Sequence, residues 1–394
     1  MSSDADTISP PAWPNSLIVC ENATEDRLTK RVMERLQGKA EISIVPNDDD
    51  PFSAERAPEL ETAERIRLGK RTLVLKRNLG SWFEHCPASA GNQVCCNLWV
   101  ANLGEGCPMD CTYCYLQSYL QRNPTSKLFT NLKDLLGLLE QKSGADPGRL
   151  FRVGIGEAID SLIWEELTDL STELVPFFGR HPNLLLELKS KHDYVDNLVA
   201  MKDEHRGRTV VSWSMNAREV SDADERGTAS LERRLAAAER CVAAGYRVGF
   251  HFDPLVYFDG CVEGYREVIS EIFRALPWQS VAWVSIGTLR YRKEMKEMMR
   301  ARFPQSRLPF GEHVLGDDQK LHYVQPLRLR LIRGVWEALR EVSSSLPVYM
   351  CMETAAAWRA VSGTLPKDDE RLDELMTRFS ANARRESRLA VVSA

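Results

Sequence analysis

Three cysteines in the run GCPMDCTYCYLQ have the spacing of ligands to a metal cluster. Cys107, Cys111 and Cys114 follow the pattern C-x3-C-x2-C, and thiolates are the usual protein ligands of iron–sulfur clusters. Three thiols on one loop can ligate three irons of a 4Fe-4S cubane, which leaves the fourth iron open to a small molecule. Zinc sites more often contain two C-x2-C pairs or Cys and His pairs, and this chain has no second C-x2-C pair. We therefore expect a 4Fe-4S cluster, with structural zinc or a redox thiol group as the alternatives.

The residues around this motif resemble those of a known enzyme superfamily. The cysteine spacing, with the aromatic Tyr113 just before the third cysteine, is similar to the signature of radical SAM enzymes. The longer run CPMDCTYCYLQSYL, preceded by KRTLVLKR and followed by a β/α pattern, resembles the spore photoproduct lyase family. The resemblance spans residues 71–363. It implies S-adenosyl-L-methionine (SAM) as the occupant of the open iron and, for the lyase family, a thymine dimer lesion in DNA as the substrate.

Two glycines and a carboxylate follow a predicted strand in the run VGIGEAIDSL. Gly154 and Gly156 would let the backbone approach a ligand closely, and the carboxylate of Glu157 can accept hydrogen bonds from an ammonium group. The segment resembles the glycine-glycine-glutamate element of radical SAM enzymes, which contacts the amino group of the methionyl part. A plain strand-to-helix turn has the same G-x-G-E pattern.

Polar residues also end the next two predicted strands. By similarity to the lyase family, Lys191 and Ser214 would hold the carboxylate and the ribose of SAM. Asn216 has an amide suited to the same oxygens, but it could instead cap the following helix.

Three further residues are candidates for binding the substrate. His251 and Asp253 in the run HFDP share one face of a predicted strand, where they could be substrate groups or a buried His–Asp contact. Arg290 follows the next strand, where a phosphate or carboxylate could bind. Residues 290–307 contain seven basic and two acidic residues, so this stretch forms either a DNA-binding patch or a solvated helix face.

The hydrogen-atom relay that the resemblance implies is incomplete in this sequence. Tyr113 and Tyr115 flank Cys114, and such tyrosines look like participants in radical relay in the lyase family. The family also uses a cysteine after the second barrel strand as a hydrogen-atom donor, but the segment GIGEAIDS contains none. Tyr113, Tyr115 or Cys351, which follows the predicted strand LPVYM, would have to substitute.

Alternating strands and helices must position these residues. The pattern predicts a parallel sheet, and six β/α units fit a partial (β/α)6 TIM-like barrel of the radical SAM type, with active-site residues at the carboxyl ends of the strands. The predicted strands are NLWVANL, LFRVGIG, LLLELKS, RTVVSWSMN, YRVGFHFD and SVAWVSIG. The predicted helices cover residues 132–142, 164–178, 195–204, 229–244 and 262–275.

A small α/β unit precedes the predicted barrel. Its predicted strands are SLIVC, EISIV and RTLVLKR, and a predicted helix over residues 24–36 lies between the first two in sequence. The expected organisation of this α/β chain is a flexible tail at 1–16, the small unit at 17–90, the barrel with a C-terminal extension at 91–363, and a helical tail at 364–394.

Composition indicates an ordinary globular protein in a reducing compartment. Of 394 residues, 43% are hydrophobic and 27% charged, and no apolar run approaches the length of a membrane helix. The start MSSDADTISPPAWPNS lacks the features of a signal peptide, and most of the ten cysteines cluster instead of spreading as disulfide pairs would. We therefore expect a cytoplasmic protein without a membrane partner. The net charge of −5 argues weakly against non-specific nucleic-acid binding.

The resulting hypothesis is a radical SAM lyase that uses a 5′-deoxyadenosyl radical to repair thymine photolesions in DNA, with an electron from a small protein or a chemical donor. One alternative keeps the radical chemistry and changes the substrate to RNA, a peptide or a metabolite. Another is a non-enzymatic iron–sulfur protein that binds nucleic acid.

Overall fold

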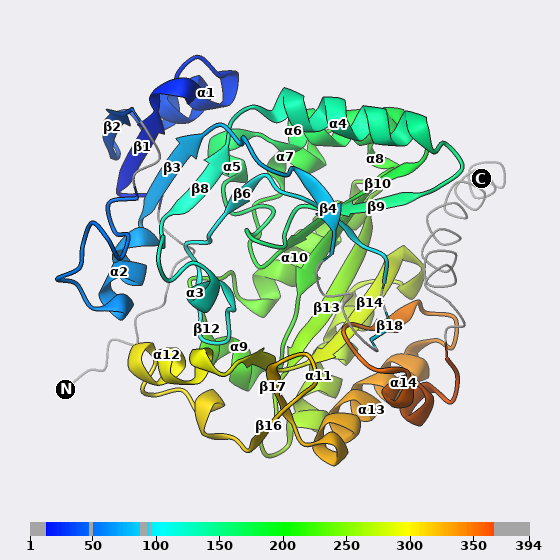
Figure 1. Ribbon diagram of the computed structural model, residues 1–394. Helices are drawn as coiled ribbons and strands as arrows, with labels where there is room; N and C mark the ends of the chain where they lie inside the picture. The colour runs from blue at the N-terminus through cyan, green and yellow to red at the C-terminus, as the bar shows by residue number, and fades with distance from the viewer. Residues whose placement is uncertain (1–12, 47–49, 87–92, 95, 366–394) are drawn as a thin grey trace, which may run out of the picture.

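A computed structural model describes residues 13–46, 50–86, 93–94 and 96–365 (Figure 1). Most of the predicted tail at 1–16 and of the predicted helical tail at 364–394 lies outside these residues. Ser16, assigned to the tail, is the first residue of a strand.

A curved sheet of eight strands forms the centre of the molecule (Figure 1). The six predicted barrel strands are present, and each pairs in parallel with the next along the chain, so the predicted fold class is confirmed. They are β5 (Trp99–Ala101), β9 (Phe151–Gly154), β10 (Leu184–Ser190), β11 (Thr209–Ser214), β13 (Arg247–Leu255) and β14 (Val281–Thr288). At one edge β18 (Val348–Met350) adds a parallel strand, and at the other β4 (Phe83–His85) pairs antiparallel with β5.

Helices cover the outside of this sheet, because each buries an apolar stripe against the strands. The long ones are α4 (Leu132–Ala145), α6 (Ser171–Arg180), α10 (Leu231–Ala243), α11 (Cys261–Ala275) and α13 (Gln325–Val342). Two predicted helices are each divided in the structure. Residues 164–178 form α5 (Glu165–Thr168) and part of α6, separated at Asp169, whose φ is +50°. Residues 195–204 form α7 (Asp196–Val199) and the start of α8 (Asp203–Arg206).

The inward-facing side of the sheet is polar. Successive side chains of a strand point to opposite faces, so Leu186 and Leu188 of β10 are buried on one face while Glu187 and Lys189 occupy the other. His251 of β13 is hydrogen-bonded to Glu187, which identifies this second face as the barrel interior. The barrel therefore has an apolar shell and a charged interior.

The small N-terminal unit has more strands than predicted. The three predicted strands are β1 (Ser16–Cys20), β2 (Glu41–Val45) and β3 (Thr72–Lys76), with α1 (Arg27–Leu36) and α2 (Thr62–Gly69) between them. The sheet order is β2-β1-β3-β8-β6. Its last two strands, β8 (Ser126–Phe129) and β6 (Gly104–Glu105), come from either side of the cysteine loop.

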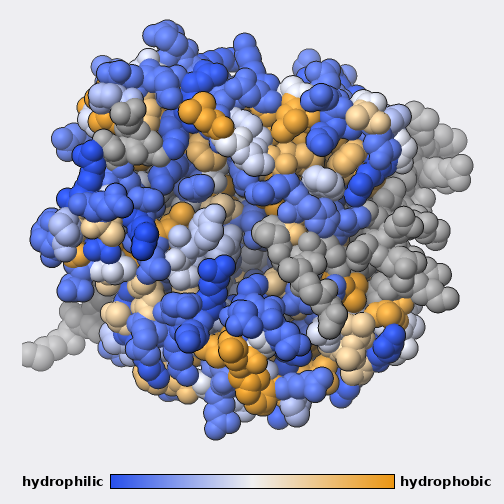
Figure 2. Space-filling model, viewed as in Figure 1, coloured by the Kyte–Doolittle hydropathy of each residue, from blue (hydrophilic) through white to orange (hydrophobic). Residues whose placement is uncertain are grey.

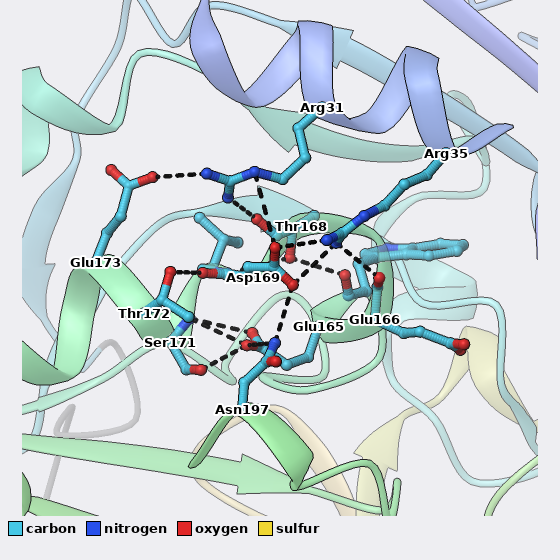
Figure 3. A network of polar contacts seen from close by, with 12 residues as sticks. Arg31, Arg35, Glu165, Glu166, Thr168, Asp169, Ser171, Thr172, Glu173 and Asn197 are labelled. Carbon is cyan, nitrogen blue, oxygen red and sulfur yellow. Dashed lines mark hydrogen bonds and ion pairs between the residues drawn. The ribbon is translucent and has the colours of Figure 1, made fainter. Parts of the chain in front are cut away.

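Polar contacts join α1 to the barrel helices (Figure 3). Arg35 donates two hydrogen bonds to Asp169, at 2.6 and 2.9 Å, and Asn197 donates to the same carboxylate at 3.0 Å. Arg31 donates to the Thr168 carbonyl. The turn between α5 and α6 is thus the attachment point of the N-terminal unit.

The C-terminal extension forms a three-stranded antiparallel sheet and further helices. The strands are β15 (Arg290–Arg292), β17 (Lys320–Tyr323) and β16 (His313–Leu315), in that spatial order. The helices are α12 (Glu294–Arg302) and α14 (Ala355–Ser362). No helix in the described ranges is long and apolar enough to cross a membrane.

Candidate active site

The cysteine loop lies beyond the carboxyl end of β5, at the barrel edge where the sequence predicts it. Two residues of the loop, β7 (Asp110–Cys111), pair antiparallel with β12 (Glu225–Arg226), and Cys111 is opposite Glu225. β12 follows α9 (Arg218–Asp224), after the fourth barrel strand. A distant part of the chain therefore shapes the loop that carries the three cysteines.

Side chains also fix the backbone of the loop. Lys70 donates to the carbonyl oxygen of Cys107 at 2.8 Å, and Gln117, in α3 (Leu116–Tyr119), donates to that of Cys111 at 3.1 Å. Gly106 has a φ of +84°, in the left-handed region, and a Cβ there would lie 2.9 Å from the backbone of Ser126. The glycine before Cys107 is thus required by both conformation and space.

The three thiols lie on one loop but differ in their exposure to solvent. Cys111 is buried and the other two are half-buried. Burial raises the pKa of Cys107 to about 12, and burial raises the pKa of Cys111 as well. Among the described residues no group of three or more His, Cys, Asp or Glu side chains is arranged to hold a metal ion. The cluster assignment therefore rests on the type, spacing and shared loop of Cys107, Cys111 and Cys114, a donor set that suits iron–sulfur ligation.

A buried carboxylate that the sequence did not single out joins several predicted residues. Glu225 accepts a hydrogen bond from Tyr113 and forms an ion pair with Arg234 at 2.7 Å, and both charged side chains are 0% exposed. Lys191 lies 5.7 Å from the centre of the Tyr113 ring. Asn216 donates to Glu225 at 3.4 Å. The structure thus brings Tyr113, Lys191 and Asn216 together around an ion pair that the sequence analysis did not identify.

Asn216 makes several contacts inside the protein. Its amide nitrogen also donates to the Pro254 carbonyl at 3.2 Å, and its amide oxygen accepts from the Tyr265 hydroxyl at 2.6 Å. The same oxygen accepts from the backbone N–H of Ala217, which precedes α9. Ser214 is buried, and its carbonyl accepts from Arg234.

The second cysteine-flanking tyrosine reaches the glycine-rich segment. The Tyr115 hydroxyl donates to the Glu157 carbonyl at 2.6 Å and lies 3.5 Å from its carboxylate. A Cβ on Gly156 would lie 2.9 Å from the carbonyl oxygen of Lys189, and one on Gly154 would lie 3.3 Å from Leu98. Close packing within the barrel therefore accounts for both glycines.

His251 and Asp253 do not pair with each other but with different residues. His251 is hydrogen-bonded to Glu187 at 2.7 Å, and burial lowers its pKa. Glu187 also pairs with the buried Arg152 at 3.5 Å. The possible buried His–Asp contact is replaced by a His–Glu contact deep in the barrel.

Arg290 is oriented by a carboxylate inside the protein. Two of its nitrogens donate to the two oxygens of Asp253, at 2.9 and 3.0 Å, and the arginine side chain is 13% exposed. The same guanidinium lies 3.0 Å from the Met352 sulfur and 3.8 Å from the Cys351 sulfur. Cys351 is thus placed beside Arg290 at the carboxyl end of β18, and burial raises the pKa of its thiol.

Sequence reasoning missed the residues that serve as partners. Glu225, Arg234 and Glu187 belong to no sequence motif, and the contacts that make each of them important form only in the folded protein. The one signal was the presence of ionisable residues within or beside apolar strands, since charged groups are rarely buried unless paired.

A family model for spore photoproduct lyase matches residues 13–320. The spore photoproduct lyase of Geobacillus sp. (strain Y412MC61) is 28% identical over 250 residues, which are 63% of this chain and 71% of that protein. The enzyme of the same name from Bacillus subtilis (strain 168) is 27% identical over 251 residues, or 63% of this chain and 71% of that protein.

Solved structures share the fold. A spore photoproduct lyase complexed with dinucleoside spore photoproduct is 24% identical, with a TM-score of 0.75 and coverage of 86% of this chain and 99% of that one. A variant lyase with bound AdoMet and dinucleoside spore photoproduct gives a TM-score of 0.74 at 24% identity, covering 87% and 99% of the two chains. The sequence, its cysteine loop and its partial barrel lead to one assignment: this chain belongs to the spore photoproduct lyase family of radical SAM enzymes.

Proposed function

We propose that this enzyme repairs thymine photolesions of the spore photoproduct type in DNA, using a 4Fe-4S cluster on Cys107, Cys111 and Cys114 together with SAM. The observation that carries the proposal is the three-cysteine loop at the carboxyl edge of the barrel in a member of this family. When bound, the cluster supplies the electron that cleaves the SAM sulfonium to methionine and a 5′-deoxyadenosyl radical. The similar variant lyase was solved with AdoMet bound, which supports SAM as a ligand of this fold.

Residues around the loop are suited to hold SAM. Glu157 offers a carboxylate to the ammonium group beside Gly154 and Gly156, while Lys191 offers a cation to the SAM carboxylate. Ser214 lies at the end of β11, where its hydroxyl can meet the ribose. Asn216 would act through its contact with Glu225, which also holds Tyr113.

Hydrogen return is assigned to Cys351 and the tyrosines. Cys351 would give the hydrogen atom of its S–H bond to the product radical and become a thiyl radical. That radical would take a hydrogen atom from Tyr115, whose hydroxyl is joined to the Glu157 segment, with Tyr113 as the alternative. One electron from the reductant and one proton would then return the tyrosyl radical to tyrosine. The position of Cys351 at the end of β18 supports this role, because active-site residues gather at that edge.

DNA would bind over the C-terminal antiparallel sheet. Arg290 is turned inward, so we assign the phosphate contacts to exposed cations that follow it, Arg292, Lys293 and Arg307. Figure 2 shows hydrophobic atoms gathered over β16 and β17, and Val314 and Leu315 are 48% and 56% exposed. An exposed apolar edge beside cations suits DNA whose lesion must be extruded to reach the barrel. His251 and Asp253, held by Glu187 and Arg290, would position substrate groups only indirectly.

The cluster and the reduced cysteines suit a reducing compartment such as the cytoplasm, where a small protein or a chemical reductant would supply the electron.

The test uses anaerobically reconstituted protein, SAM, a strong reductant and DNA carrying spore photoproduct. We expect formation of 5′-deoxyadenosine and recovery of thymine. Clean cleavage of SAM with unchanged lesions would assign another substrate, such as RNA, a peptide or a metabolite. Absence of 5′-deoxyadenosine would leave a non-enzymatic iron–sulfur protein.

Paired variants test the hydrogen relay. Cys351→Ala should slow thymine recovery and leave the product radical to form other products. Cys241 is a buried cysteine on α10, remote from the carboxyl edge of the barrel, so Cys241→Ala should do neither. Tyr115→Phe should reduce turnover. Tyr119 is 62% exposed at the end of α3, the helix that follows Tyr115, so Tyr119→Phe should not. Equal behaviour of the members of either pair would remove that residue from the relay.

A further inference from the structure

A cavity of about 400 Å³ lies in the N-terminal unit, and its lining includes none of the three loop cysteines. Its wall is formed by the residues that end or follow the parallel strands of the N-terminal sheet. Cys20 closes β1, Pro46 follows β2, Lys76 closes β3 and Phe129 closes β8. The volume is in the range of small-molecule sites.

The topology of the sheet places this cavity where α/β sheets bind ligands. β1 connects through α1 to β2 on one side of it, and the chain then returns through α2 to β3 on the other side. The connections that follow β1 and β3 therefore lead in opposite directions. A crevice outside the carboxyl ends of parallel strands at such a reversal is the usual binding position in open α/β sheets.

One residue that lines the cavity is a mostly buried cation whose ion-pair partner lies at the limit of contact. The Lys127 side chain is 8% exposed, and its ammonium lies 4.0 Å from the Glu105 carboxylate. A mostly buried cation with only a distant counter-charge gains from further anionic oxygens, so a ligand that carries several of them would stabilise it.

The rest of the lining defines the chemistry of that ligand. Lys76 and Arg77 add positive charge, and Asp26 holds the Arg77 guanidinium at 2.6 Å. Leu79, 87% exposed at the rim, and the buried Phe129 give apolar surface for an organic group. Three cations and one carboxylate, Glu105, line the cavity together with these apolar side chains, and this excess of positive charge suits a molecule with a phosphate at one end.

We propose that this cavity binds a phosphate group, carried by a nucleotide-sized small molecule or by a nucleic-acid strand, with Lys127 as its principal contact. The charged contact would be made by a lysine whose side chain is mostly buried before the ligand arrives, so binding requires little side-chain reordering. The site is separate from the cysteine loop and does not depend on the reaction proposed above.

Calorimetric titration of the reconstituted protein tests the proposal, with inorganic phosphate, adenosine monophosphate, adenosine and an oligothymidylate without terminal phosphates. We expect saturable binding of phosphate and the nucleotide, and none of adenosine. If the oligothymidylate competes with phosphate, the natural source is a nucleic-acid backbone. If it does not, the source is a small molecule.

Lys127→Met keeps the aliphatic stem and removes the charge. It should weaken phosphate binding about tenfold or more, because a hydrogen bond to a charged group is lost. Lys142→Met, an exposed lysine on α4, is the matched control and should bind as the wild type does.

A second variant, Leu79→Asp, tests the same cavity without a change in the protein core. The side chain is almost fully exposed, so the fold is retained while a negative charge is added at the rim, and phosphate binding should weaken. Absence of saturable phosphate binding in the wild type, or binding that both Lys127→Met and Leu79→Asp leave unchanged, would overturn the proposal.

Discussion

Glu225 and Arg234 form an ion pair with no exposure to solvent, directly behind the cysteine loop. Neither charge can be hydrated, so each depends on the other and on Tyr113, Asn216 and the Ser214 carbonyl. Such a pair adds little stability compared with apolar residues of similar volume, but removing one partner leaves a buried, uncompensated charge. The pair therefore makes the shape of the loop sensitive to a single substitution.

Glu225→Gln should lower the free energy of unfolding by about 3 kcal/mol, because Arg234 would remain buried without its counter-charge. Urea unfolding measures the effect. Glu232→Gln is the matched control, since that carboxylate is 61% exposed in its pair with Arg218. Equal losses in both variants would contradict a special role for burial.

A second residue-scale prediction separates two roles for Arg290. If Asp253 mainly orients this guanidinium, Asp253→Asn should destabilise the fold by about 2 kcal/mol, as measured by urea unfolding. Asp259→Asn, at an exposed position after β13, should have little effect. Unchanged stability of Asp253→Asn would point instead to Arg290 as a substrate anchor that needs no internal partner.

Spacing could single out the three cysteines as candidate ligands because all three lie on one loop, where sequence distance limits spatial distance. The same reasoning placed Tyr113, Lys191 and Asn216 at one edge, and the structure brings them together around Glu225. It could not predict Glu225 as the shared partner, nor the pairing of His251 with Glu187. Those contacts join different strands, and their geometry depends on register and barrel closure.

At the scale of elements, apolar runs predicted every barrel strand. Helix boundaries were less certain, and Asp169 shows the reason. Residues 164–178 have a continuous helical pattern, but the carboxylate of Asp169 is turned towards Arg35 in α1 (Figure 3). A contact with another part of the chain thus ends one helix and starts the next. The strands β6, β7, β8 and β12 were also missed, because they are short and exist only through their pairing.

The Asp169 contact predicts a pH-dependent stability. Partial burial raises the pKa of Asp169, but hydrogen bonds from Arg35 and Asn197 outweigh it and the net pKa is lowered. A carboxyl with a lowered folded pKa adds stability above its unfolded pKa and loses it as the pH falls through the folded value.

Asp169→Asn should therefore cost about 1 kcal/mol at neutral pH. The difference from the wild type should shrink below about pH 4. Thermal unfolding at the two pH values measures it, and asparagine also tolerates the left-handed backbone at this position. A difference that is the same at both pH values would show that the charge is not responsible.

At the scale of the whole molecule, the N-terminal unit shares strands with the segment around the cysteine loop. β8 pairs with β3, and β6 pairs with β8, although both follow β5 of the barrel in sequence. The boundary expected near residue 90 is therefore crossed by strand pairing.

One cooperative unfolding transition should follow from this shared sheet. Tryptophan fluorescence and far-ultraviolet circular dichroism should give the same urea midpoint, because removing β1–β3 would also expose the edge of β8. Two resolved transitions, the first limited to residues 13–76, would show instead that the unit unfolds alone.

The pairing of β7 with β12 has a consequence for how the enzyme matures. During synthesis the three cysteines emerge long before Glu225, and nothing opposite Cys111 is available to set the loop. Closing so long a connection carries an entropic cost that only later contacts offset. The cysteine loop should therefore reach its final shape late, after the fourth barrel strand has been made. For the proposed 4Fe-4S cluster, we expect the proteins that deliver iron and sulfide to meet an almost complete barrel and to reach the cysteines from its carboxyl edge.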